Sequence, residues 1–537
     1  MIGGLWLQWQ SGMNPNAGHP FVLLTDFPGL RAAGREPWRS AYGIVLAGAV
    51  LLGSLGAVLS VSRRLTTYGK AHFQSRREVR RNGLMQPLGS GLVFGKFGQP
   101  HRTGRFVCGS YDRFPHALVA APTRSGKGVG YVIPNTLLFP GSCVIMDVKG
   151  EIFEATARHR QGGGDRVFRI APFDFDHPTH RYNPLERIAR IADTDQRFTE
   201  LSKLASYFLI PKTEKGGASD FIVGARQLFV AAGMLAIERG TASIGAIARL
   251  LFDTANKEIA FRRVAGETRH APSATIFLNF SGYSDRTLSS YISVLDGAGL
   301  GLWLNPRIDK VTAVNDLSWD DIRRSPHAVY IVANSDDIPT LAPLLRLMFG
   351  ELIATMRARI PDPKLEPWPV QIILDEFDQL GPMPIIVQSL KQLAGHGVRV
   401  SIITQSVPGL ESIYSENERL SIEAAAGMKL YIAPNEKKTA GEVAEALGKT
   451  TRLALSDSYS QDGKGLLKRS VSRRNEERPL MTPDEIRRLA PDKVILIPER
   501  QNPILADRIV YYEDARFKAL VDAQKGPLPY PDPLRDE

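Results

Sequence analysis

The chain has 537 residues, enough for three or four domains, and its 43% hydrophobic and 23% charged content is that of a folded protein. A net charge of +11 favours anionic partners such as nucleic acid or anionic lipid, although surface Lys and Arg that serve only solubility explain the same total. Two cysteines occur, Cys108 and Cys143, without zinc-ligand spacing. This excludes a disulfide framework and a sulfur-based metal site, and it fits a reducing compartment.

Residues 41–62, AYGIVLAGAVLLGSLGAVLSVS, carry no charge, whereas segment 1–40 has no sustained hydrophobic period. About 20 apolar residues cross a bilayer core, so 41–62 predicts a transmembrane helix, with a buried core helix as the alternative. One acid, Glu78, stands among the basic residues that follow: Arg63, Arg64, Lys70, Arg76, Arg77, Arg80 and Arg81. Positive residues flank the cytoplasmic side of spanning segments, so the large C-terminal part is predicted to be cytoplasmic.

A phosphate-binding loop is predicted where the apolar strand Leu118–Ala120 ends and a helix begins. Such a loop wraps phosphates with consecutive backbone N–H groups, the helix N-terminus adds partial positive charge, and Lys127 reaches the terminal phosphates. The alternative is a glycine-rich turn before a core helix. The candidate nucleotide-binding residues are Ala121, Pro122, Thr123, Arg124, Ser125, Gly126, Lys127 and Gly128.

This loop departs at two positions from the pattern G-x-x-x-x-G-K-[ST]. Ala121 replaces the first glycine, and Gly128 stands where a Ser or Thr hydroxyl would hold Mg²⁺. The residue that supplies the inner Mg²⁺ ligand is therefore not identified, and Ser125 or a water molecule could take this place.

Hydrophobic patterning divides the rest of the chain into strand-rich and helical stretches. Residues 91–109 predict short strands, 142–147 a buried strand that ends in DVKGE, and 165–175 a third strand. Between 186 and 286 apolar residues recur at helical spacing, which predicts a mostly helical insertion. From residue 328 onward strands and helices alternate again.

Two later strands end in polar residues that suit nucleotide hydrolysis. The apolar run 370–374 ends in Asp375, which would hold Mg²⁺ through water, and Glu376, which would polarise the attacking water. The alternative role for these acids is to cap the next helix. The next strand is followed by Gln405, which is placed to sense the γ-phosphate, because neighbouring strand ends meet at the ligand crevice of a parallel sheet. Arg399 is a candidate to act in trans on the nucleotide of a neighbouring subunit, and the alternative is an ordinary surface arginine.

The C-terminal part is less informative. Residues 424–432 and 494–497 predict further strands, and 457–478 form a polar, basic stretch. That stretch suits a loop that follows a phosphate backbone, or equally a solvated mobile loop. Residues 515–537 are Pro-rich and charged, and they predict a flexible tail.

The motifs LVAAPTRSGKGVG, DVKGE, RYNPL, ILDEF, TQS and RPLMTPDEIRRL follow one another along the chain. In this order they resemble type IV secretion system coupling proteins, the membrane-anchored ATPases of conjugative DNA transfer, over roughly residues 65–500. The resemblance implies an α/β, RecA-like P-loop NTPase motor domain with an all-α inserted domain and an N-terminal transmembrane helix. It also implies a homo-hexamer in the bacterial inner membrane. Many members have two spanning helices, whereas one is evident here.

The resemblance also assigns roles, cofactors and partners. Lys127 is similar to the phosphate-binding lysine, Asp375 to the metal-binding acid, Glu376 to the catalytic acid, and Gln405 to the glutamine after the next strand. The implied cofactors are ATP and Mg²⁺. The implied partners are type IV secretion channel components and, as cargo, either a relaxase–single-stranded DNA complex (relaxosome) or protein effectors.

The predicted organisation combines these observations. In chain order it comprises an N-terminal segment (1–40), a transmembrane helix (41–62), the first part of the nucleotide-binding domain (63–185), an all-α cargo-recognition domain (186–286), the second part of the nucleotide-binding domain (287–514) and a flexible tail (515–537).

Two other functions remain open: a membrane-bound DNA translocase of another class, and a non-hydrolysing secretion receptor or scaffold. The helical insertion and the DVKGE and TPDEI segments argue against the first. The complete set of Lys127, Asp375 and Glu376 argues against the second. The sequence does not distinguish DNA from protein cargo, and it does not give the ring size or an arginine finger.

Overall fold

The computed structural model describes residues 43–54, 67–99, 101, 104–210, 217–252, 256–461 and 467–533. Contacts divide the chain into two units, a small one (Met1–Lys70 with Thr450–Arg478) and a large one (Ala71–Lys449 with Pro479–Glu537). Each unit is described by itself. The predicted segment 1–40 lies outside the described residues.

The large unit is built on one 11-stranded sheet with the strand order β2-β1-β13-β12-β9-β3-β8-β7-β4-β6-β5. The run from β9 to β5 is parallel, and β12, β13, β1 and β2 extend it with antiparallel pairs. The strands are β1 (Gly91–Phe97), β2 (Arg105–Ser110), β3 (His116–Ala120), β4 (Ser142–Asp147), β5 (Arg166–Ile170), β6 (His327–Val332), β7 (Val370–Leu374), β8 (Val398–Thr404), β9 (Met428–Ile432), β12 (Lys493–Pro498) and β13 (Ile504–Asp507).

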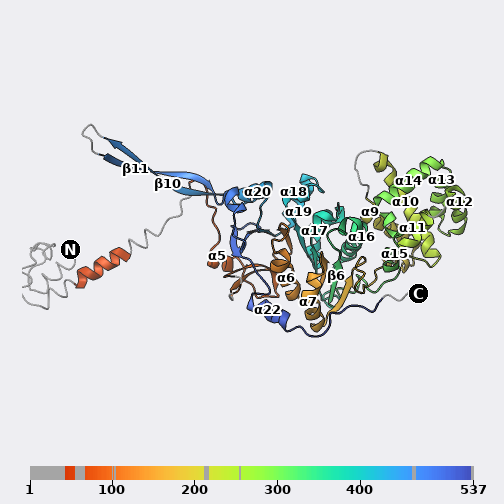
Figure 1. Cartoon of the computed structure of the whole chain (residues 1–537), viewed down its shortest axis with the longest axis horizontal. Coiled ribbons are helices and arrows are strands. Elements are labelled where there is room, and N and C mark those ends of the chain that lie inside the picture. The colour runs from red at the N-terminus through yellow and green to blue at the C-terminus, as the bar shows by residue number, and fades with distance from the viewer. Residues whose placement is uncertain are drawn as a thin grey trace, which may run out of the picture. The chain divides into compact units, whose positions relative to one another are not determined.

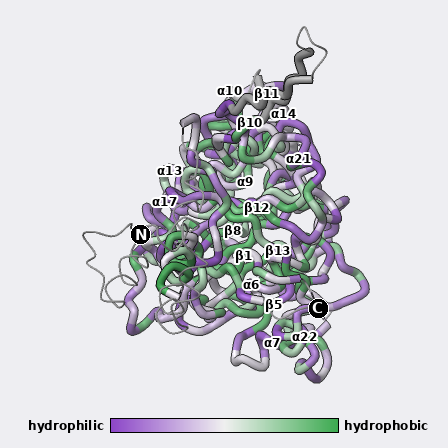
Figure 2. The backbone as a smooth tube through the Cα atoms, turned by 90° about the vertical axis from the view of Figure 1, so that its left-hand side faces the viewer, coloured by the Kyte–Doolittle hydropathy of each residue, from purple (hydrophilic) through white to green (hydrophobic). Residues whose placement is uncertain are grey.

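The central strands form because they are short apolar runs that can be buried on both faces. Every residue of β3, β4, β6, β7 and β8 is buried, as expected for parallel strands covered by helices on both sides. Cys143 is buried in β4, as predicted. Figure 2 shows hydrophobic segments around β8 and β12 inside a more hydrophilic periphery.

Helices precede, connect and follow the strands of this sheet. In chain order they are α5 (Arg76–Arg81), η1 (Gly128–Val132), α6 (Ile133–Leu138), α7 (Glu151–Gly162), α16 (Ile338–Arg357), η3 (Phe377–Gln379), α17 (Pro384–Leu393), η4 (Ala394–His396), α18 (Val407–Glu411), α19 (Glu416–Ala425), α20 (Lys437–Leu447), α21 (Pro483–Arg487) and α22 (Ala515–Asp522).

A group of helices is inserted between β5 and β6, and Figure 1 shows it beside the sheet in yellow and green. Its rings pack together: Phe208 lies 5.5 Å from both Phe229 and Trp303. The helices are α8 (Leu185–Ala189), α9 (Thr194–Phe208), α10 (Gly217–Glu238), α11 (Ile244–Phe252), α12 (Lys257–Glu267), α13 (Ala271–Ser281), α14 (Asp285–Ala298), η2 (Leu300–Leu304) and α15 (Pro306–Val311). Helices therefore continue beyond residue 286, and the domain boundaries stay a prediction.

Two described helices are long and apolar enough to cross a membrane, Phe221–Glu238 and Ile338–Arg357. Their apolar windows are 61% and 72% buried inside the folded unit, so they are core helices. The predicted spanning segment 41–62 contains a shorter apolar helix, Gly43–Ser54, and its remaining residues lie outside the described ones. The transmembrane helix stays a prediction.

The small unit contains a two-stranded ribbon, β10 (Lys449–Gln461) and β11 (Leu467–Pro479), where the sequence predicted a loop. Thr451 in β10 accepts hydrogen bonds from the backbone N–H groups of Tyr68 (2.9 Å) and Gly69 (3.3 Å).

The predicted flexible tail is wrong for its first residues. Helix α22 begins after Asp514, which caps it by accepting from the backbone N–H of Arg516, and Phe517 is completely buried. The Pro-rich and charged composition of the segment gave no indication that Phe517 would be buried.

Candidate nucleotide-binding site

The predicted phosphate loop lies between strand β3 and the helical segment that begins with η1. The backbone N–H of Ala121 donates to the carbonyl of Thr404 (2.9 Å), which ties the loop to the end of β8. Arg124 (φ 63°) and Gly126 (φ 83°) adopt left-handed conformations that reverse the chain toward the helix. A compact loop that precedes a helix is the geometry that suits an anion.

The structure brings Lys127 together with both acids that follow β7. The Nζ atom of Lys127 lies 2.7 Å from Oδ1 of Asp375 and 3.5 Å from Oε1 of Glu376. Strand β8 lies between β3 and β7, so the loop and the acids occupy neighbouring positions along the carboxyl edge of the parallel strands. In this state the single charge of the lysine offsets part of the charge of the two acids. A nucleotide phosphate would compete for it.

Both acids are buried, and Glu376 has an unusual backbone conformation. Asp375 is 5% exposed and Glu376 is 7% exposed. Burial raises the pKa of Asp375, and the charge of Lys127 offsets this only in part. Glu376 adopts a left-handed backbone (φ 52°), which is uncommon for a non-glycine residue.

Sequence reasoning missed one neighbour of the catalytic candidate. The side-chain amide of Gln379, on η3, donates to Oε2 of Glu376, so both carboxylate oxygens of Glu376 have a polar contact. The spacing of three residues in a tight turn was the available signal. Gln379 holds Glu376 in one orientation.

Gln405 follows β8 directly and is partly buried at the same carboxyl edge as Asp375. Its role toward the γ-phosphate stays a prediction. Arg399 lies at the opposite end of β8, 9% exposed, and donates to the carbonyls of Ala394 (2.9 Å) and Val398 (3.3 Å). It is committed to contacts within its own chain, so the hypothesis of a residue acting in trans is not supported.

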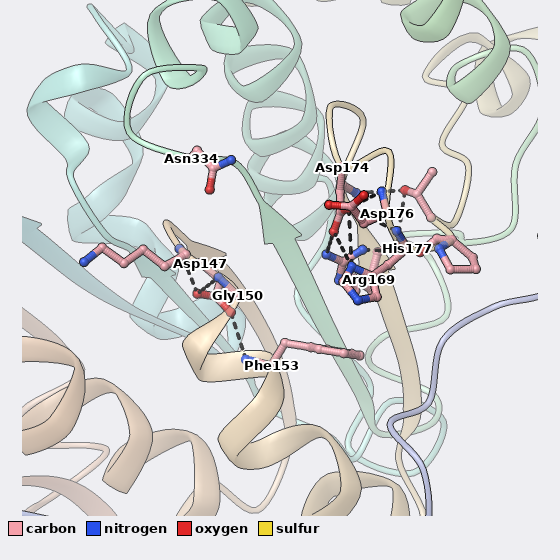
Figure 3. A network of polar contacts seen from close by, with 12 residues as sticks. Asp147, Gly150, Phe153, Arg169, Asp174, Asp176, His177 and Asn334 are labelled. Atoms are coloured by element: carbon pink, nitrogen blue, oxygen red, sulfur yellow. Dashed lines mark hydrogen bonds and ion pairs between the residues drawn. The ribbon is translucent and has the colours of Figure 1, made fainter.

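The DVKGE segment forms a turn at the end of strand β4, which pairs with β7 (Figure 3). The carboxylate of Asp147 accepts from the backbone N–H groups of Gly150 (2.9 Å) and Phe153 (2.8 Å). Burial raises the pKa of Asp147 to about 6, although the backbone N–H donors act to lower it. Gly150 has φ 78°, which only glycine adopts readily, and Lys149 is left exposed beside it.

A second residue that the sequence did not indicate contacts the loop from the far end of the chain. The Nη1 atom of Arg508, just after β13, donates to the carbonyl of Ser125 (2.6 Å). A Cβ at Gly126 would lie 2.5 Å from that Nη1 atom, and a Cβ at Gly130 would lie 3.1 Å from the Arg508 side chain. The lack of a side chain at both glycines therefore allows Arg508 to pack against the loop.

Replacing Arg508 by Ala is expected to weaken ATP binding by about tenfold, because the loop loses a charge-assisted hydrogen bond. The measurement is the dissociation constant of a fluorescent ATP analogue on the full chain. Arg500→Ala is the matched control, since this arginine is 90% exposed and pairs only with its neighbour Glu499 among the described residues. Equal affinity in the wild type and in Arg508→Ala would refute a role in positioning the loop.

Comparison with known proteins decides the family. A family profile described as "Type IV secretory system Conjugative DNA transfer" matches residues 69–528. The chain belongs to this family. The VirD4 protein of Rhizobium rhizogenes is 35% identical over 490 residues, which cover 91% of this chain and 72% of the relative.

Other relatives agree with this assignment. The conjugal transfer protein TraG of Escherichia coli is 27% identical over 598 residues, covering 99% of this chain and 90% of TraG. The plasmid coupling protein TrwB in complex with a non-hydrolysable ATP analogue has the same fold, with a TM-score of 0.61 at 15% identity, covering 84% of this chain and 96% of TrwB. The predicted RecA-like P-loop NTPase fold of this coupling-protein family is therefore confirmed.

Proposed function

We propose that this coupling-protein family member is a membrane-anchored ATPase that delivers a relaxosome or protein cargo to a type IV secretion channel and drives its transfer by ATP hydrolysis. The observation that carries the proposal is the convergence of Lys127, Asp375 and Glu376 at the end of a phosphate-type loop. TrwB, which shares the fold, is known in complex with a non-hydrolysable ATP analogue and with ADP and Mg²⁺. The anchor would be the helix at 41–62, and the ring would be a homo-hexamer.

The residues of the site fit Mg²⁺ despite the missing hydroxyl at Gly128. The Oγ atom of Ser125 is buried and, among the described residues, has no hydrogen-bond partner. Asp375 and the Ser125 hydroxyl would hold the ion, which matches its preference for oxygen ligands. Bound with the nucleotide, Mg²⁺ would neutralise charge on the phosphate oxygens.

The residues of this chain then divide the work of hydrolysis. Lys127 would leave the acids for the terminal phosphates, and the loop N–H groups would orient the phosphate chain. Freed from Lys127, Glu376 would accept a proton from the attacking water, with its carboxylate oriented by Gln379. Gln405, at the end of the neighbouring strand β8, would contact the γ-phosphate and so sense whether it is bound.

The test is the ATPase activity of the full chain, reconstituted in nanodiscs, with and without single-stranded DNA. Turnover that DNA stimulates is expected if the cargo is a relaxosome. Turnover indifferent to DNA would favour protein cargo. No turnover at protein concentrations that support rings would refute the ATPase and favour a non-hydrolysing receptor.

A further inference from the structure

A cavity lies at the β2 edge of the sheet, away from the nucleotide loop. Its volume is about 380 Å³, and three arginines from three separate elements line it: Arg80 of α5, Arg105 of β2 and Arg516 of α22. Between β2 and β3 there are five strand spacings, or about 24 Å. We call this cavity the arginine-rimmed pocket, and it is not part of the candidate ATPase site.

The charge of this pocket is uncompensated. Its lining contains no Asp or Glu, and within the part of the chain that the structure describes none of the three guanidinium groups has an ion-pair partner. The nearby carboxylate of Asp514 is taken up by Lys96 (2.6 Å), with both side chains buried. Three exposed arginines that line one pocket without an acid offer several donors to a phosphate-type anion.

The floor of the arginine-rimmed pocket is apolar. Met85, Leu88 and Phe106 line it and pack against the core of the large unit. Phe106 contacts the ring of Phe517 edge to face at 5.5 Å, so its ring is held by the core. An apolar floor of this kind suits methylene groups beside a phosphate.

Helix α5, which lines the pocket, follows the predicted membrane segment closely in the sequence. Thirteen residues (63–75) separate residue 62 from α5, and an extended chain of that length spans at most about 45 Å. Helix α5 carries three further arginines: Arg76, Arg77 and Arg81. Basic segments next to a spanning helix are attracted to the anionic cytoplasmic leaflet.

We propose that the arginine-rimmed pocket binds the headgroup of an anionic phospholipid, with the three guanidinium groups on the phosphate and the apolar floor against the glycerol and first methylene groups. The choice of lipid rests on the proposed membrane anchor, whereas the recognition of a phosphate beside an apolar group rests on the pocket alone.

The experiment uses the full chain in detergent with a water-soluble, short-chain phosphatidylglycerol that carries a photoreactive group near the headgroup. We expect labelling of peptides that contain Met85 or Phe106. Labelling should fall by roughly tenfold or more in Arg80→Gln/Arg105→Gln/Arg516→Gln. The control is Arg286→Gln, an exposed arginine of the inserted helices, and it should label like the wild type.

The other arms distinguish the sources of the anion. Labelling by the phosphatidylcholine analogue at equal strength, or labelling unchanged in the triple variant, would overturn the proposal. Displacement of the lipid by millimolar inorganic phosphate would show a free-phosphate site instead, and crosslinking of single-stranded DNA to the same peptides without lipid labelling would show a nucleic-acid site. Loss of flotation with vesicles while labelling persists would refute the anchor and leave the pocket supported.

Discussion

Replacing Glu376 by Gln is expected to lower ATP turnover by at least about 100-fold while the chain still binds nucleotide. The amide keeps the shape of the side chain but cannot accept a proton from water. The contact between Lys127 and this side chain is long, 3.5 Å, so its loss should disturb the loop little. Phosphate release and the affinity for a fluorescent ATP analogue, both measured on the full chain, check the two parts of this prediction.

Two further variants serve as controls for the effect of Glu376→Gln. Glu445→Gln changes an exposed glutamate of α20 in the same sheet unit and should leave turnover unchanged. Lys127→Ala should lose both turnover and nucleotide affinity, because this side chain is predicted to contact the phosphates. Turnover of Glu376→Gln within a factor of a few of the wild type would rule out Glu376 as the catalytic base.

The buried ion pair between β1 and the C-terminal segment should be the most sensitive structural contact. Replacing Lys96 by Met is expected to lower the free energy of unfolding by about 3–5 kcal/mol, because the Asp514 carboxylate is left buried without its cation. The side chains of Lys96 and Asp514 are 0% and 1% exposed. Urea denaturation of the purified chain at neutral pH measures the change.

The double variant Lys96→Met/Asp514→Asn should recover most of that loss, since asparagine is neutral and still caps α22. The matched control is Lys518→Met, which removes the lysine of an exposed pair with Asp522 and should cost less than about 1 kcal/mol. A loss in Lys96→Met no larger than in Lys518→Met would show that burial does not govern this pair.

Most of the candidate site was predictable because its signals are local. The loop from Ala121 to Gly128 is one contiguous motif, and Asp375 and Glu376 directly follow a buried apolar run. Each strand end predicts its own polar residues, and a parallel sheet places such ends on one edge. The proximity of Lys127 to both acids follows from that rule and is observed.

The contacts of Gln379 and Arg508 could not be derived in the same way. Gln379 contacts Glu376 only because η3 turns the chain back within three residues. Arg508 is separated from Ser125 by 383 residues, and only the strand order places its guanidinium on the loop. Contacts between distant segments depend on packing, which local patterns do not encode.

The sequence by itself determined the family, the alternation of strands and helices, and the residues that suit nucleotide chemistry, because each depends on order and spacing along the chain. The tertiary structure decided that α10 and α16 are core helices, that Arg399 serves its own strand, and that α22 is packed by Phe517. It also created the arginine-rimmed pocket, whose three guanidinium groups come from separate elements. Burial and the grouping of distant side chains are properties of the folded chain, since only packing determines which distant groups lie side by side.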